Sequence, residues 1–455
     1  MTVIFPPTQL STWTVAPTGR RQELVVARAL PVLGLKWPFM KTILGLVLAV
    51  TSAASATTIA PVLAQDWVLT GAPSTNWSCV ASSADGTKLV AAVNPGLIYL
   101  STNAGEAWTP TTAPSTAWKS VASSADGTKL VAASAFYDGT SGQVYRSVDS
   151  GAHWQPSLAS DSDGWISVAS SADGSTLAAA GDIDLVHVST NSGATWTDLA
   201  PGGIPTSARF PAVASSADGH EMVVAEVASV GTPVSDIVAT PSSAWVESPP
   251  GVASFSPGLC TSLAMSADGT RVAATIKEAD AFGAGSTNCA SILLTWLNSG
   301  ATKIPNCTSV SNWTSVATSA DGIRLAAVAS SGDVYTSTNG GVTWAPNIVT
   351  NVSWSGVASS ADGAKIVAVA SGGGIYTWQT TPTPTLNINR TGEDLQISWL
   401  IPSMSFVLQQ SADLGSTNWT AVESALIVNL TNLQNQVTLS PPSHPTFYRL
   451  SSTAP

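Results

Sequence analysis

The side chains of this sequence that could do chemistry are its carboxylates, which fall into two sets. The first set recurs in the tetrapeptide SADG, with its carboxylate at Asp85, Asp126, Asp173, Asp218, Asp268, Asp321 and Asp362. The second set lies between these copies and includes the closely spaced pairs Asp161/Asp163 and Asp182/Asp184. Paired carboxylates can act as acid and base in glycoside hydrolysis, or hold a calcium ion through their oxygens. The elements that carry each set decide whether it is available for such chemistry.

The SADG copies belong to a long repeat, whose units are numbered 1 to 7 in chain order. Successive Asp residues are 41 to 53 residues apart, and eight positions before each one stands Trp77, Trp118, Trp165, Phe210, Cys260, Trp313 or Trp354. Ala-Asp-Gly between two apolar runs predicts a hairpin turn, because Asp caps the turn and Gly accepts a positive φ. We therefore expect the seven SADG carboxylates to be structural.

Each unit has the pattern of four short strands. In unit 1 these are expected at 77–82, 87–93 and 97–101, with a fourth after the stretch STNAGEAWT. Seven such units predict an all-β fold, a seven-bladed β-propeller over residues 65–379. Unit 7 stops after its third strand, 374–378, whereas an unassigned strand from Asp66 aligns with the fourth strand of unit 1 from Ala107. We expect this N-terminal strand to complete the last blade, which closes the ring and shields an open edge.

A second motif lies between the third and fourth strands of several units. Ser-x-Asp/Asn-x-Gly-x-x-Trp fits STNAGEAW at 101–108, SVDSGAHW at 147–154, STNSGATW at 189–196 and STNGGVTW at 337–344. This motif resembles the Asp-box, or BNR repeat, of sialidases and related propellers, and the resemblance covers residues 66–379. It also extends to propellers that assist photosystem II assembly, which bind protein, and to xyloglucan-cleaving enzymes. In the sialidases the box lies on the face away from the active site. We therefore expect it to be structural here, with Asp or Asn bonding its own turn and Trp packing on the blade.

Sialidase activity itself is not expected. The sialidases that the motif resembles bind their acidic sugar with three arginines that lie together. The arginines of the predicted propeller are Arg146, Arg209, Arg271 and Arg324, and they are not placed to do this. Arg271 and Arg324 occupy a repeat position three residues after the SADG Asp, and only Arg209 falls in a loop on the opposite face. The tyrosines that could supply a nucleophile also occupy repeat positions, namely Tyr99, Tyr145, Tyr335 and Tyr376.

The face opposite the SADG turns is the candidate binding surface, because its loops vary between units and binding sites concentrate in such loops. These loops are 134–143, 160–164, 181–185, 226–236 and 277–288. The candidate ligand-binding residues are Tyr137, Asp138, Asp161, Asp163, Asp182, Asp184, Arg209, Glu226 and Asp280. The carboxylates could be solvated loop residues, ligand or calcium contacts, or catalytic groups. We predict a non-catalytic binding protein for a glycan or an extracellular protein, with a glycoside hydrolase as the alternative, and assign no catalytic residue, metal or cofactor.

The composition favours an exported protein. The net charge of −11 and the pI near 4.7 argue against nucleic acid as a partner, because phosphate contacts need clustered Lys and Arg. Residues 40–64 resemble a signal peptide, with Lys41, an apolar run at 43–50 and cleavage options after Ala56 or Ala64. Residues 1–39 are then a non-native extension, whereas a rival interpretation takes 1–64 as one long export signal. The apolar run is short for a bilayer span, so the mature chain is expected to be exported, without a membrane span, and monomeric.

Two further features are a pair of cysteines within the repeat array and a module that follows it. Cys289 and Cys307 flank a predicted hairpin about Asn298, where they could form a disulfide or remain two thiols. A Pro/Thr-rich linker at 380–385 precedes residues 386–455, whose alternating apolar and polar residues predict a small β-sandwich. This C-terminal module is similar to the fibronectin-III-like modules of secreted bacterial proteins.

Overall fold

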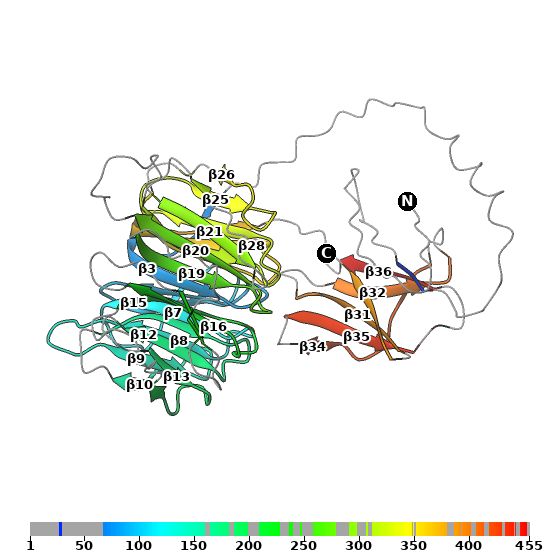
Figure 1. Ribbon diagram of the computed structural model, residues 1–455, viewed down its shortest axis with the longest axis horizontal. Helices are drawn as coiled ribbons and strands as arrows, with labels where there is room; N and C mark the ends of the chain where they lie inside the picture. Colours follow the sequence, from blue (N-terminus) through cyan, green and yellow to red (C-terminus); the bar gives the residue numbers. More distant parts are fainter. Residues whose placement is uncertain are drawn as a thin grey trace, which may run out of the picture.

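The computed structural model is an all-β protein in the residues that it describes (Figure 1). These are 27–29, 67–159, 164–181, 186–198, 209–227, 236–239, 246–247, 258–278, 291–297, 306–307, 312–347, 349, 352–379, 386–392, 394–401, 406–413, 418–429, 433–440, 442 and 446–452. No helix occurs within these residues, and the prediction of an all-β fold is confirmed for them. Figure 1 places the repeat sheets, blue to yellow, beside the C-terminal sheets, orange to red.

Units 1 to 6 each form four consecutive antiparallel strands. The strands of units 1 to 3 are β3 (Thr75–Ser82), β4 (Leu89–Val93), β5 (Ile98–Ser101), β6 (Thr109–Pro110), β7 (Trp118–Ser123), β8 (Leu130–Ser134), β9 (Gln143–Ser147), β10 (Gln155–Ala159), β11 (Trp165–Ser170), β12 (Leu177–Gly181), β13 (Val186–Ser189) and β14 (Thr197–Asp198). Those of units 4 to 6 are β15 (Arg209–Ser215), β16 (Met222–Val227), β17 (Asp236–Ala239), β18 (Val246–Glu247), β19 (Gly258–Met265), β20 (Arg271–Glu278), β21 (Ser291–Leu297), β22 (Asn306–Cys307), β23 (Trp313–Thr318), β24 (Leu325–Ala329), β25 (Val334–Ser337) and β26 (Ala345–Asn347).

Unit 7 has three strands of its own, β27 (Trp354–Ser359), β28 (Lys365–Gly373) and β29 (Ile375–Gln379). A fourth comes from the other end of the repeat array, because β2 (Val68–Leu69) pairs antiparallel with β29. The far end of β28 also pairs with β3 of unit 1, joining the strands of units 7 and 1 in one eight-stranded sheet. The first and last units are therefore in direct contact.

The core of each unit follows from its residue pattern. The second strand of units 1, 2, 3 and 6 is a run of Leu, Val, Ala, Ser or Gly that is buried along its whole length. The first-strand tryptophan is also buried, and an aromatic ring of the third strand meets it edge-on at 5.1 to 5.4 Å. These third-strand partners are Tyr99, Tyr145, His187, Tyr335 and Tyr376. Edge-to-face packing of this kind stabilises these five units, 1, 2, 3, 6 and 7, beyond their apolar burial.

The first strands lie next to one another in the order β3, β7, β11, β15, β19, β23, β27 and again β3. The SADG alanines form a matching circuit of backbone hydrogen bonds, in which each N–H donates to the carbonyl of the next alanine at 2.7 to 2.9 Å. The circuit runs through Ala84, Ala125, Ala172, Ala217, Ala267, Ala320 and Ala361, whose N–H returns to Ala84. The repeat sheets therefore lie side by side around a common centre.

The C-terminal module contains two sheets around one core. One sheet has the order β30 (Asn387–Thr391), β31 (Asp394–Leu400), β35 (Gln434–Leu439) and β34 (Ile427–Asn429). The other has β36 (Thr446–Ser452), β32 (Phe406–Ser411) and β33 (Thr420–Ala421), and β1 (Ala27–Ala29) from the N-terminal part of the chain pairs with β36. Ile397 and Trp399 of the first sheet pack with Leu408 and Tyr448 of the second. Trp399 and Tyr448 are buried in this core, and Phe406 packs partly buried against it.

Candidate functional site

The SADG carboxylates are occupied within their own turns. In unit 2, Ser124 Oγ donates to Asp126 Oδ1 at 2.6 Å, and the N–H of Thr128 donates to the same oxygen at 2.9 Å. Ser124 Oγ in turn accepts the Lys129 N–H at 3.0 Å. The Ser-to-Asp bond recurs at 2.5 to 2.7 Å in all seven units. These carboxylates therefore act as turn caps, the role predicted from their repetition.

The pKa values of these groups agree with this role. Desolvation by burial would raise the pKa of each carboxyl, but the hydrogen bonds outweigh it and the pKa lies below its usual value at Asp85, Asp126, Asp173, Asp218 and Asp268. At Asp85 and Asp126 the charges of Lys365 and Lys88 lower the pKa further. A general acid near neutral pH needs the opposite shift, so these five carboxyls are unsuited to that task.

In five of the seven units a Lys or Arg follows the SADG turn and lies on the turn of the next unit, whereas Thr176 and Glu221 take this position in units 3 and 4. Lys88 Nζ donates to the Asp126 carbonyl at 2.8 Å, and a Cβ on Gly127 would lie 2.7 Å from Lys88 Cδ. Arg271 and Arg324 cover Gly322 and Gly363 in the same way. Arg146 instead donates from Nη1 to the Ser192 carbonyl at 3.0 Å. These three arginines therefore have structural contacts within the repeat sheets.

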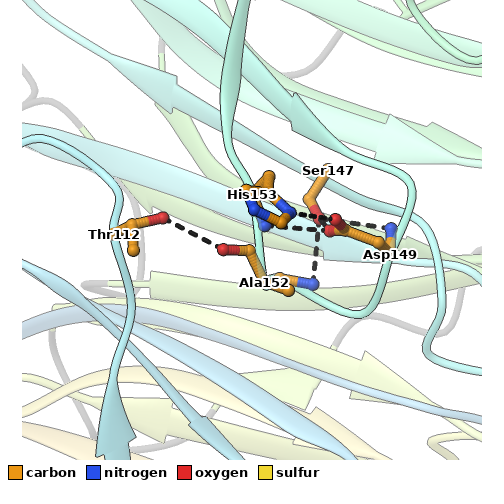
Figure 2. Close-up of polar contacts among 6 residues, drawn as sticks. Thr112, Ser147, Asp149, Ala152 and His153 are labelled. Atoms are coloured by element: carbon orange, nitrogen blue, oxygen red, sulfur yellow. Dashed lines mark hydrogen bonds and ion pairs between the residues drawn. The ribbon is translucent and has the colours of Figure 1, made fainter.

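The second motif also forms a closed turn, which we call the box turn (Figure 2). In unit 2, Ser147 Oγ donates to Asp149 Oδ1 at 2.8 Å. The Gly151 N–H donates to Ser147 Oγ, and the His153 N–H donates to Asp149 Oδ1. His153 Nδ1 lies 2.6 Å from Asp149 Oδ2. Hydrogen bonds from His153, first from its backbone and then from its side chain, and from Ser147 lower the pKa of Asp149 to about 2. This acidic group is thus a turn cap as well.

The box turns and the SADG turns lie at the same face of the repeat sheets. Backbone N–H groups of the box turns at Ala104, Ser150, Ser192 and Gly340 donate at 2.8 Å to the residue after the SADG glycine of the same unit. These four bonds place the two motifs at one face of the repeat sheets. The connections from second to third strands therefore leave at the opposite face.

On that opposite face, the connection from β8 to β9 presents two exposed aromatic side chains. Phe136 is 56% and Tyr137 38% exposed. The backbone beneath them is ordered by a tight turn, because Tyr137 and Thr140 exchange N–H to carbonyl bonds at 2.9 and 3.1 Å. Asp138 and Gly139 between them both have positive φ, 48° and 79°, as a type I′ hairpin requires. A rigid turn thus holds the exposed aromatic pair in place.

The base of this aromatic loop is fixed by close backbone contact. Ala135 forms an isolated β-bridge with Gly164, which directly precedes β11 of unit 3. Gly164 has a φ of 117°, and a Cβ there would lie 2.6 Å from Ala135 Cα and 3.0 Å from the Phe136 nitrogen. Gly142 is enclosed by Gly164 and by the Ser134 carbonyl in the same way. Only glycines permit this approach, so the loop of unit 2 is fastened to unit 3.

The predicted site residues are only partly brought together. Tyr137 and Asp138 lie in the aromatic loop, whereas Asp161, Asp163, Asp182, Asp184 and Asp280 lie outside the described residues. Arg209 is the first residue of β15, and it pairs with Val227, the last residue of β16. Glu226 precedes Val227, so the backbones of Arg209 and Glu226 lie at the same end of unit 4. Sequence reasoning missed Phe136, although an apolar ring beside Tyr137 in a Gly- and Ser-rich loop was the available signal.

The described residues offer little other chemistry. They hold no group of three His, Cys, Asp or Glu side chains placed to bind a metal ion. Cys79 is a free thiol that burial desolvates, which raises its pKa to about 12 and makes it unreactive. Cys307 pairs with Ile292 in the predicted hairpin, but Cys289 lies outside the described residues. The described residues contain no helix that is long and apolar enough to cross a bilayer.

Comparison with known proteins identifies the fold. No family model matches the chain, and no curated protein matches its sequence. YCF48 from Cyanidioschyzon merolae is similar over 69% of this chain and 98% of its own, with a TM-score of 0.50 and 16% identity. The β-propeller domain of Cps50 (Swd1) from Myceliophteria thermophila is similar over 69% of this chain and 100% of its own, with a TM-score of 0.52 and 15% identity. The prediction that the repeat array forms a β-propeller is confirmed.

Proposed function

We propose that this chain is an exported, non-catalytic binding protein whose ligand contacts the face opposite the box turns. The observation that carries the proposal is the exposed pair Phe136 and Tyr137 on a rigid turn. Exposed aromatic rings of low conformational freedom are the side chains that anchor protein interfaces, and they also stack on sugar rings. The repetitive face, in contrast, has its carboxylates bound within turns.

The scaffold of this binding protein is a seven-bladed Asp-box propeller closed by β2. Support comes from three contacts between units 7 and 1: the pairing of β2 with β29, the Ala361 N–H bond to Ala84, and the Ser355 Oγ bond to the Trp77 carbonyl at 2.6 Å. Closure removes an exposed strand edge, which would otherwise recruit other chains. The C-terminal module, with two sheets around one core, is a fibronectin-III-like sandwich in this proposal.

The ligand is a neutral glycan or a neutral to basic segment of an extracellular protein. The net charge of −11 disfavours acidic ligands through long-range repulsion. A glycan array and a phage-displayed peptide library, each presented to the purified full chain, separate the two classes. The ligands recovered are then measured again with the Phe136→Ala/Tyr137→Ala variant.

The matched control for this experiment is Val148→Ala/Val342→Ala. These valines are 57% and 52% exposed and belong to the box turns of units 2 and 6. We expect the aromatic variant to lose at least about tenfold in affinity, about 1.4 kcal/mol, because hot-spot truncations cost more than 1 kcal/mol. The control should bind as the wild type does. Ligands that bind the aromatic variant undiminished while the control loses them would overturn the proposal.

The same glycans also test the alternative of glycoside hydrolysis. Product release would make the chain an enzyme, and its loss in Asp138→Asn would assign a role to the one predicted carboxylate that lies in the described aromatic loop. Export is tested separately by the intact mass of the secreted chain, which should begin after Ala56 or Ala64. An unprocessed chain retained in the cell would contradict export, and size-exclusion chromatography should show a monomer.

A further inference from the structure

The SADG alanines do more than link neighbouring units, because their side chains form one apolar cluster. Ala84, Ala172, Ala217, Ala267, Ala320 and Ala361 are buried, and Ala125 is partly buried against them. Hydrogen-bonded neighbouring strands lie about 5 Å apart, so a circuit of seven backbones is about 11 Å across. Methyl groups around such a ring leave an apolar seat that is wide enough for aliphatic side chains.

Three side chains of the C-terminal module pack against this ring. They are Leu400 at the end of β31, the following Ile401, and Leu433 just before β35. Ile401 N–H donates to the Leu433 carbonyl at 2.9 Å, so the end of β31 and the start of β35 are held together. None of the three belongs to the core cluster of the module itself, which Ile397, Trp399 and their neighbours form. These apolar side chains therefore serve a contact outside the module's own core.

The backbone of Leu433 supports the same assignment. Its φ is 52°, a left-handed conformation that non-glycine residues rarely adopt, and for a bulky residue it signals strain or a functional constraint. Strained residues persist only where surrounding contacts over-determine their conformation, and they concentrate at functional contacts. Leu433 is thus a bulky side chain that the module displays, at a conformational cost, towards the alanine ring.

We propose that the alanine ring is the docking seat of the chain's own C-terminal module, which caps the SADG face through Leu400, Ile401 and Leu433. The cap is fixed to the propeller rather than carried freely on the 380–385 segment. Alanine then recurs in every SADG copy for two reasons: its backbone links the units, and its small side chain leaves room for the cap. Because the cap covers the centre of one face, the face with Phe136 and Tyr137 is left open, whatever it binds.

Photo-cross-linking in the full chain tests the contact directly. A diazirine analogue of leucine replaces Leu433, and in a control chain it replaces Ile427, which lies in the same module and is 58% exposed. We expect irradiation at position 433 to give cross-links to peptides that contain the SADG alanines, and irradiation at position 427 to give none. Cross-links from 433 confined to the module or to another face of the propeller would overturn the proposal.

A second measurement uses solution scattering on full-length variants. Ile401→Asp/Leu433→Asp places two charges against the apolar ring and should release the module, so the radius of gyration rises. Ile427→Asp adds a charge to the same module away from the ring and should leave the radius unchanged. Hydrogen exchange in the β31 peptide that contains Ile397 and Trp399 checks in both variants that the module core is intact. An unchanged radius in the double variant, with the core intact, would also overturn the proposal.

Discussion

Replacing Asp85 by alanine tests whether the repeated carboxylates are structural. Asp85 Oδ1 accepts hydrogen bonds from Ser83 Oγ at 2.6 Å and from the Thr87 N–H at 3.0 Å, and Thr87 Oγ1 lies 2.8 Å from Oδ2. The substitution leaves these three donors without their acceptor in a partly buried turn. The adjacent Lys365 of unit 7 also loses its opposite charge.

The size of the effect follows from these contacts. A hydrogen bond to a charged group contributes about 1.5 to 3 kcal/mol, but water can replace the carboxylate at a partly exposed turn, so about 1 kcal/mol per donor is realistic. The loss is then about 2 to 3 kcal/mol of unfolding free energy. For a propeller of about 310 residues, an unfolding entropy of about 2.1 cal/mol/K per residue converts this to a fall of about 4 °C in Tm.

Urea denaturation and calorimetry of wild type, Asp85→Ala and Asp85→Asn measure the effect. Asparagine keeps one acceptor oxygen but not the charge, so it should retain about half of the lost stability. The predicted order of stability is wild type, Asn, Ala. If Asp85→Ala were as stable as the wild type, the carboxylate would not be a turn cap and a chemical role would have to be reconsidered.

Three further predictions concern the same scaffold. Deleting residues 65–72 removes β2 from β29 and should lower the Tm in one cooperative transition, whereas an unchanged melting curve would contradict closure by this strand. Gly127→Ala should lower the free energy of unfolding by about 1 kcal/mol more than Gly139→Ala. Both glycines have a positive φ, but only at Gly127 would the added Cβ meet a neighbour, Lys88. Equal urea midpoints for the two variants would refute the packing argument. The folded-state pKa of Asp85, Asp126, Asp173, Asp218 and Asp268 is lowered, so their contribution to stability is present above the unfolded value near 3.8 and is lost as the pH falls through the lower folded values. Urea midpoints measured from pH 7 to pH 2 should therefore drop mainly below pH 4, and a flat profile there would contradict the assigned hydrogen bonds.

The repeat made most of the fold predictable. A carboxylate that recurs in one frame with a tryptophan eight residues earlier has a local cause, turn chemistry and strand packing, which sequence alone can express. The predicted strand at 77–82 differs from β3 (Thr75–Ser82) only at its start, where β3 also pairs with β28 of the last unit. That extension depends on a contact across nearly the whole repeat array, which no local pattern reports.

The candidate site was less predictable because its features are not repeated. Tyr137 and Asp138 were singled out for their residue type, but the exposure of Phe136 depends on the turn at 138–139 and on the approach of Gly164 from the next unit. The docking of Leu400, Ile401 and Leu433 was not predicted either. An alternating pattern predicts that such residues are buried, but it does not show whether they pack within their own module or against another part of the chain. Here they pack against a ring of alanines from seven distant turns.

The central claim is that the seven units form one closed ring, with its structural residues on one face. Native-state hydrogen exchange at the Ala361 amide tests it most directly, because this N–H bonds to the Ala84 carbonyl at 2.8 Å and joins the last unit to the first. A closed ring predicts that Ala361 exchanges as slowly as the equivalent amides of Ala125, Ala172 and Ala320, with opening free energies near that of global unfolding. If Ala361 exchanged about tenfold or more faster than these amides, a gap of about 1.4 kcal/mol, the ring would open between units 7 and 1 and the claim would be contradicted.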